Sequence, residues 1–191
     1  MTRFVEALAP AVYRLDTNRT SVVGEASKPA SNMQIWKMES YPVGDRRLPH
    51  HVFPPKHLTV DDLRKKAGVT YYKVNLADTQ AMKKRLSAVK KENSVNTGDI
   101  LTIDENVADL AKVMDDLYEE QEVAAPTVCM VVDGEMYMDV EYEDEEWLRL
   151  HLEKGDLVVV PKNMLHRYTT TPTNFFRLQR FSPIDPQNIV A

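Results

Sequence analysis

The second half of the sequence, from residue 127 to residue 181, consists of short apolar or alternating runs separated by tight-turn sequences. Side chains alternate along residues 135–141, so that Met136, Met138 and Val140 share one face. Asp-Gly at 133–134 is a strong hairpin signal, and further turns are predicted at 143–146 and 154–156. Strands this short and this closely spaced favour a sheet closed into a barrel. The predicted strands are 127–132, 135–141, 147–152, 157–160 and 175–181.

The first half of the sequence has mainly helical patterns. One helix is predicted over residues 60–67, since Thr59 and Asp62 have the spacing of a capping box and Gly68 follows as a stop signal. A basic helix is predicted to begin at Thr79 and to end near residue 92. A third helix is predicted with Asp104 as its N-cap, because apolar residues then recur at helical spacing, namely Val107, Leu110, Met114, Leu117 and Tyr118. With two short strands at 33–38 and 69–74, the fold class is α+β.

Charge and cysteine content narrow the classes of function. The chain of 191 residues has 24 Lys and Arg against 29 Asp and Glu, so its net charge of −5 does not favour nucleic-acid binding. The lysines of the basic helix are interpreted as a solvated face, with RNA or an acidic partner as the alternative, since no aromatic platform accompanies them. The apolar run 128–132 is too short to span a membrane. The single cysteine, Cys129, excludes an internal disulfide and a cysteine-based zinc site, and suits a reducing intracellular compartment.

Residues 1–32 differ in composition from the rest of the chain and are predicted to form an N-terminal arm or leader. Loop-forming residues are dense here, and a weak amphipathic pattern is interrupted at Pro10. The arginines Arg3 and Arg14 suit a mitochondrial presequence, whereas the acidic residues of the segment argue against one. We therefore favour a retained arm, and the compartment stays open between cytoplasm and mitochondrion.

One motif connects the predicted barrel with a known family. The run Gly155-Asp156-Leu157-Val158-Val159-Val160-Pro161, followed five residues later by His166-Arg167-Tyr168, resembles the second cupin motif in the form found in acireductone dioxygenases. The similarity extends over about residues 33–181, through Met33 to Trp36, Arg47-Leu48-Pro49-His50, Gly68-Val69, Tyr72-Lys73, Asp133-Gly134, Tyr137 to Val140 and Trp147-Leu148-Arg149. Residues 33–191 are therefore expected to form one acireductone dioxygenase-like domain, a cupin-type double-stranded β-helix with a few flanking helices.

The resemblance implies an enzyme of the methionine salvage pathway. Members of this family oxidise an acireductone with molecular oxygen, using iron or nickel held by three histidines and one glutamate. Three of these ligands come from a His-x-His-x-x-x-Glu segment of one strand, and the fourth comes from the later cupin motif.

Three of the four ligand positions carry other residues in this sequence. Counting back from Asp133-Gly134, the first three positions fall on Gln121, Val123 and Thr127, and His166 alone is kept. Glu119-Glu120 matches the lead-in to this segment, which supports the register. An arginine that binds substrate in the family falls on Cys129. The positions 121, 123 and 127 have one parity, so on a strand they would face the barrel together.

These donors are too weak for iron or nickel, which prefer imidazole and carboxylate ligands. We therefore expect no metal, no cofactor and no catalytic residue. The leading hypothesis is a non-catalytic protein whose barrel serves as a structural or binding subunit of a larger assembly, with protein partners at the arm of residues 1–32 and at the barrel surface. The alternatives are a working iron- or nickel-dependent acireductone dioxygenase, and a metal-free pocket for a small molecule beside Gln121, Cys129 and His166.

The remaining histidines and the cysteine have structural interpretations. His166 is expected to be a hydrogen-bonded core residue, a metal ligand only if a remodelled site recruits another histidine. His50 is expected to pack within its loop, while His51 and His57 flank Pro54-Pro55 and are expected at the surface. His151 lies on a predicted strand. Cys129 is expected to be a small buried hydrophobe, with a reactive thiol as the alternative.

Overall fold

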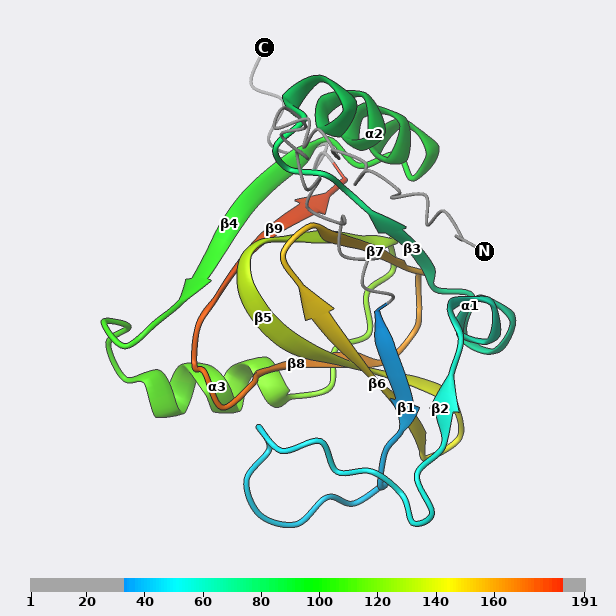
Figure 1. Cartoon of the computed structure of the whole chain (residues 1–191), viewed down its shortest axis with the longest axis vertical. Coiled ribbons are helices and arrows are strands. Elements are labelled where there is room, and N and C mark those ends of the chain that lie inside the picture. The colour runs from blue at the N-terminus through cyan, green and yellow to red at the C-terminus, as the bar shows by residue number, and fades with distance from the viewer. Residues whose placement is uncertain (1–32, 184–191) are drawn as a thin grey trace, which may run out of the picture.

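The computed structural model describes residues 33–183, which form one nine-stranded sheet curled into an open barrel with three helices on its outside (Figure 1). The strand order along the main path is β2-β1-β6-β5-β7-β3, while β8 and β9 pair with β5 and β4 pairs with β9. This is the α+β barrel that the sequence predicts. The N-terminal arm predicted for residues 1–32 lies outside the described residues.

The elements have the following bounds. The helices are α1 (Val60–Ala67), α2 (Thr79–Glu92) and α3 (Leu110–Tyr118). The strands are β1 (Gln34–Lys37), β2 (His57–Leu58), β3 (Thr70–Lys73), β4 (Thr97–Ile103), β5 (Thr127–Glu143), β6 (Glu146–Glu153), β7 (Asp156–Val160), β8 (His166–Thr170) and β9 (Phe176–Ser182).

Strand β5 is the spine of the fold, because it pairs antiparallel with β6, β7, β8 and β9. The hairpin predicted at Asp133-Gly134 is wrong, since β5 continues through these residues as one strand of 17 residues. The register against β9 shifts between Val131 and Asp133, and Gly134 has φ of +73°. The positive φ that Asp-Gly can supply is therefore used for a β-bulge, which bends the strand around the barrel, rather than for a turn.

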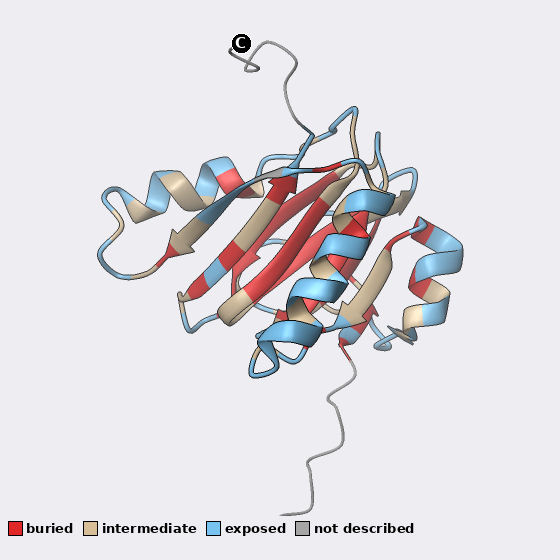
Figure 2. Cartoon of the chain, turned by 90° about the horizontal axis from the view of Figure 1, so that it is seen from above, coloured by how far each residue is buried: buried red, intermediate tan, exposed pale blue. Residues whose placement is uncertain are grey.

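The inner face of the sheet carries the main hydrophobic core. The predicted shared face of Met136, Met138 and Val140 is confirmed, and each of these side chains is completely buried. On β6, the neighbouring leucines Leu148 and Leu150 extend the same core. Each such buried side chain contributes roughly 1.5–3 kcal/mol relative to exposure. Figure 2 shows the result, with buried residues concentrated on the strands and exposed ones on the outer sides of the helices.

The opposite face of β5 and β6 is also buried, under the loop of residues 39–56. Asp139 and Arg149 form an ion pair with 2.6 Å between Oδ1 and Nε, and both side chains are essentially inaccessible. Arg149 also donates from Nη1 to the backbone carbonyls of Arg46 and Leu48, at 3.0 and 2.5 Å. The buried guanidinium therefore fixes the overlying loop in place.

The first two helices begin and end where the sequence predicts. Thr59 and Asp62 form the capping box of α1, and Gly68 ends this helix with φ of +64°. The cations of α2 are mostly exposed, as predicted, but two aromatic rings lie beneath them: Arg85 covers Tyr72 and Lys90 covers Phe181, at 5.0 and 5.2 Å from the ring centroids. None of the helices within residues 33–183 is long and apolar enough to cross a membrane.

Helix α3 begins later than predicted. Asp104 is not its N-cap, because the carboxylate accepts from the backbone N–H of Asn106, at 2.8 Å, and holds a local turn instead. Asp109 occupies the N-cap position with a left-handed backbone and no side-chain cap.

The strand β4 was not predicted from the sequence, since it contains Gly98 and Asp99, which disfavour strands. Pairing along its whole length with β9 stabilises it nonetheless.

Candidate functional site

The four positions that the sequence register assigns to the metal ligands of the family line one cavity. Gln121, Val123, Thr127 and His166 surround a space of about 320 Å³, together with side chains from β9 and the start of β4. Convergence of these positions is therefore as predicted from the sequence register. Among them, His166 is buried, Gln121 and Thr127 are half-buried, and Val123 is exposed.

The way in which they converge differs from the prediction. Residues 121–126 are not part of a strand, because β5 begins only at Thr127. Gln121 instead forms an isolated β-bridge with His166, with N–H···O distances of 2.9 and 3.1 Å between their backbones. The carbonyl of Val123 accepts from the N–H of Asn163 at 2.8 Å. Two loops held against each other, rather than the parity of one strand, therefore bring these residues to the cavity.

His166 is held as a neutral imidazole. Its Nδ1 lies 2.9 Å from the carbonyl oxygen of Met164, so this nitrogen carries the proton and Nε2 is left as the acceptor. The ring packs edge-on against Tyr168, with 5.5 Å between centroids. Burial lowers the pKa of His166 below its ordinary value, and the bond to Met164 opposes this only in part. His166 is therefore the hydrogen-bonded core residue that the sequence predicts, with one lone pair available.

The cavity contains an ion pair that the sequence analysis missed. Arg180 of β9 and Asp99 of β4 both line it, and Arg180 Nε donates to Asp99 Oδ1 at 3.1 Å. This bond lowers the pKa of Asp99 and raises that of Arg180. Arg180 pairs across strands with Cys129, the position that the resemblance assigns to the substrate-binding arginine of the family. A guanidinium therefore remains in the cavity, and the pairing of β5 with β9 is the signal that would have found it.

Cys129 does not line the cavity, which corrects its place in the predicted pocket. The side chain belongs to the barrel core and is 1% exposed, because Cys129 lies two residues further along β5 than Thr127, on the same face of the strand. Burial raises the pKa of its thiol to about 12. This position is that of the small buried hydrophobe that was expected, and it disfavours the alternative of a reactive thiol.

The other histidines lie away from this cavity. The side chain of His50 is buried in its loop, with Nε2 2.7 Å from the carbonyl of Asp45. His57 is exposed, as predicted. His51 is half-buried rather than at the surface, because its ring packs between Trp36 and His57 at centroid distances of 4.7 and 5.5 Å. No remodelled site around His166 follows from these positions.

His151 belongs to a separate group on β5 and β6. Its Nε2 lies 2.9 Å from Glu135 Oε2, and Glu153 lies across the strand from Glu135. The ligand atoms of these three residues lie within 4.8 Å of one another, and within residues 33–183 they form the one group of three or more metal-ligand side chains this close together. The cavity beside His166 has no such group in the part of the chain described.

Comparison with known proteins identifies the family of the chain. A family model described as the ARD/ARD' family matches residues 34–188. The chain is 55% identical over 149 residues to a Caenorhabditis briggsae protein named probable inactive acireductone dioxygenase 2, which covers 78% of this chain and 94% of that protein. It is 32% identical over 155 residues to the acireductone dioxygenase of Drosophila melanogaster, with 81% and 82% coverage.

A solved structure shows the fold. The acireductone dioxygenase from Bacillus anthracis, which has a cadmium ion in its active centre, superposes with a TM-score of 0.65 at 18% identity and covers 80% of this chain and 93% of that one. The barrel is therefore of the predicted cupin type, and its β1 begins where the family match begins. Since the family model matches most of the chain, this protein belongs to the ARD/ARD' family of acireductone dioxygenases.

Proposed function

We propose that this protein is a non-catalytic member of the acireductone dioxygenase family, whose barrel serves as a structural or binding subunit. The observation that carries this proposal is the donor set of the cavity: one imidazole nitrogen from His166, one neutral amide, one hydroxyl and one isopropyl group. A divalent iron or nickel ion needs several imidazole or carboxylate donors. The residues present do not fit the metal of the family, and we expect no cofactor here.

The remaining carboxylate in the cavity does not complete a site. Asp99 is held by Arg180, so a cation there would compete with a guanidinium already in place. The Glu135, His151 and Glu153 group lies apart from the cavity, because none of its members lines that space. The name of the Caenorhabditis briggsae relative, probable inactive acireductone dioxygenase 2, supports the same conclusion.

The second candidate is a working acireductone dioxygenase of the methionine salvage pathway. It is favoured by the 32% identical Drosophila melanogaster protein, which carries that name. The donor set argues against it, since no described side chain supplies the three missing ligands at His166. The two candidates therefore differ in one measurable property, which is the metal bound in the cavity.

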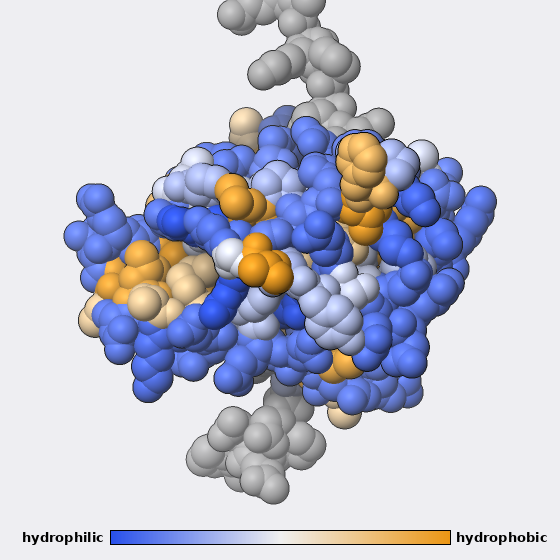
Figure 3. Space-filling model, turned by 90° about the horizontal axis from the view of Figure 1, so that it is seen from below, coloured by the Kyte–Doolittle hydropathy of each residue, from blue (hydrophilic) through white to orange (hydrophobic). Residues whose placement is uncertain are grey.

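The binding half of the proposal is supported by the loop between β1 and β2. Three of its side chains, Tyr41, Val43 and Phe53, are 72%, 89% and 97% exposed. Exposed apolar side chains that gather on one face are typical of protein interaction sites. Figure 3 shows hydrophobic atoms standing out from a mostly hydrophilic face at the end of the molecule where this loop lies. We propose a protein partner at this loop and, outside the described residues, at the arm 1–32.

Elemental analysis of the purified full-length protein tests the catalytic half, together with oxygen uptake in the presence of acireductone. We expect neither stoichiometric metal nor oxygen uptake. His166→Ala and His151→Ala identify the source of any metal found. Loss of metal in His166→Ala alone, together with oxygen uptake by the parent, would establish the dioxygenase candidate. Loss in His151→Ala alone would place the metal at the Glu135 group and leave the proposal intact.

A gain-of-ligand variant tests whether the register of the cavity is correct. Restoring Gln121→His, Val123→His and Thr127→Glu together supplies the donors of the family, so we expect this variant to bind nickel that the parent does not bind. The same three substitutions combined with His166→Ala provide the control, which should bind less. Equal metal content in the triple variant and the parent would show that these positions do not form the metal site.

Native gel filtration of the protein from its source tests the partner. We expect the protein to elute in a complex with another protein, and Tyr41→Ser, Val43→Ser and Phe53→Ser together to release it. Ile100→Ser, at a 58% exposed position on β4 away from this loop (Figure 1), is the control. Elution of the unaltered protein as a monomer would contradict the binding-subunit proposal.

A further inference from the structure

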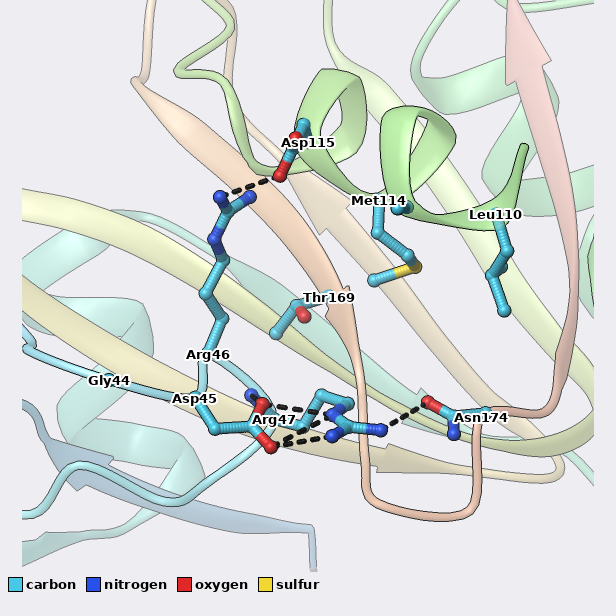
Figure 4. Close-up of a pocket in the computed structure, with 10 residues that line it drawn as sticks. Gly44, Asp45, Arg46, Arg47, Leu110, Met114, Asp115, Thr169 and Asn174 are labelled. Carbon is cyan, nitrogen blue, oxygen red and sulfur yellow. Dashed lines mark hydrogen bonds and ion pairs between the residues drawn. The ribbon is translucent and has the colours of Figure 1, made fainter.

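A second cavity, of about 450 Å³, lies away from the family site, between α3 and the loop that follows β1. Figure 4 shows its walls: Asp45, Arg46 and Arg47 on the loop, Leu110 and Met114 on α3, and Thr169 of β8 between them. None of these residues lines the cavity around His166. Its size is that of a pocket for a small organic molecule.

Thr169 gives this cavity an unusual polar group. The side chain is 1% exposed, and its hydroxyl has no hydrogen-bond partner among the described residues. An unsatisfied buried hydroxyl destabilises a fold, so native structures contain few of them. The side chain of Met114 extends from α3 toward this hydroxyl (Figure 4). Because methionine is unbranched and flexible, it can move aside and open the hydroxyl to the cavity.

The charges in the cavity decide which ligand suits it. Both carboxylate oxygens of Asp45 accept from Arg47, and this bonding lowers the pKa of Asp45 to about 2. Arg46 Nη2 lies 2.6 Å from Asp115 Oδ1. The face of the same guanidinium covers the ring of Tyr118, at 4.9 Å from the centroid. A guanidinium has five N–H donors, so the bond to Asp115 leaves others of Arg46 available. The carboxylates are thus already paired, whereas donors of Arg46 and Thr169 are left for an acceptor.

We propose that this cavity binds a small carboxylic acid with an apolar chain. The carboxylate accepts hydrogen bonds from the Thr169 hydroxyl and the Arg46 guanidinium, and the chain packs against Leu110 and Met114. Charge-assisted bonds of this kind are stronger than neutral ones. The loop side of the site is rigid before the ligand arrives, because the buried Arg149 holds the carbonyls of Arg46 and Leu48.

The test is a titration of the full-length protein with hexanoate, observed through methionine methyl groups labelled with carbon-13. We expect the Met114 methyl signal, assigned with Met114→Leu, to shift at millimolar hexanoate. Hexan-1-ol has the same chain without the charge and is expected to bind about tenfold more weakly or worse. Equal binding of the alcohol would overturn the carboxylate assignment, and no shift of Met114 with hexanoate would overturn the site itself.

Two variants separate binding from folding. Thr169→Val keeps the side-chain shape and removes the unpaired hydroxyl, so the melting temperature should be equal or higher. The affinity for hexanoate should fall about tenfold. Thr171→Val is the matched control, because its hydroxyl donates to Glu135 at 2.9 Å outside the cavity. It should lower the melting temperature and leave binding unchanged. Arg46→Met should weaken binding and Arg177→Met, on β9, should not; unchanged affinity in Thr169→Val and Arg46→Met would refute the proposal. The metal content plays no part in this result, so the proposed function is tested separately.

Discussion

Asp139→Asn tests the energetics of the charges buried on the outer face of the sheet. Asp139 is 1% exposed and accepts from two guanidiniums, those of Arg149 at 2.6 and 2.7 Å and of Arg167 at 3.2 Å. Arg167 lies over the rings of Tyr118 and Trp147, at 4.4 and 4.1 Å from their centroids. Neutralising Asp139 therefore leaves the completely buried Arg149 without a counter-charge.

The expected loss is large because both charges are removed from water. Breaking a buried ion pair by removing one partner costs roughly 3–5 kcal/mol, a large part of the stability of a typical domain. In a protein of this size this corresponds to a melting temperature lower by roughly 6–20 °C. The double variant Asp139→Asn with Arg149→Met removes the unpaired cation too, so we expect it to be more stable than Asp139→Asn alone.

Urea denaturation followed by circular dichroism measures these differences. Asp99→Asn is the control, because its ion pair with Arg180 is 59% and 39% exposed on the two sides and contributes about 1 kcal/mol or less. Equal losses in Asp139→Asn and Asp99→Asn would refute the argument from burial. A double variant that is less stable than Asp139→Asn would show that the bonds of Arg149 to the loop carbonyls outweigh the cost of its unpaired charge.

Three further predictions concern single residues. Gly134→Ala should cost roughly 2–6 kcal/mol of unfolding free energy, because its φ is +73° and a Cβ would lie 2.4 Å from a backbone oxygen. Gly44→Ala is the control and should cost less, since Gly44 has φ of +97° but open space around it. Equal losses in the two variants would contradict the steric argument. Cys129 should resist iodoacetamide in the folded protein, since burial raises its pKa to about 12, and it should react once the protein is unfolded in urea. Alkylation of the native protein would show that solvent reaches Cys129 in the folded state. Burial lowers the pKa of His166 and of His51, so folding favours their neutral forms, and their contribution to stability is complete above the ordinary pKa of about 6.5. Stability should fall as the pH decreases from there through the lower folded pKa, and His166→Asn should show a smaller fall in melting temperature, whereas an unchanged fall would exclude His166.

Local signals determined how much of the fold could be predicted. The bounds of α1 and α2 follow from caps and stop residues within a few positions of the helix ends, as Thr59 and Gly68 show. The errors arose where one local signal has two structural uses. Asp133-Gly134 suits a hairpin and a bulge equally, and only the pairing of β5 with β9 selects the bulge. Asp104 can cap a helix or a turn, and here it holds the turn.

The site was predicted in part for the same reason. The register identified Gln121, Val123 and Thr127, and the structure gathers them beside His166 through a β-bridge that sequence parity does not contain. Arg180 was missed because it reaches the cavity from a strand about 50 residues away in sequence, through pairing with Cys129. Long-range pairing is not encoded in any short motif, so a single sequence cannot place such residues.

The separation between core and cavity explains how the barrel tolerates different residues at the positions that the register assigns to metal ligands. Gln121, Val123 and Thr127 are only half-buried or exposed, and none belongs to the hydrophobic core, so changing them costs the barrel little. Restoring all three ligands should therefore leave the melting temperature of the metal-free protein almost unchanged. Nickel should then raise the melting temperature of the restored variant and not that of the parent, because a ligand that binds only the folded state stabilises it. A restored variant that unfolds without metal would show that these positions support the fold after all.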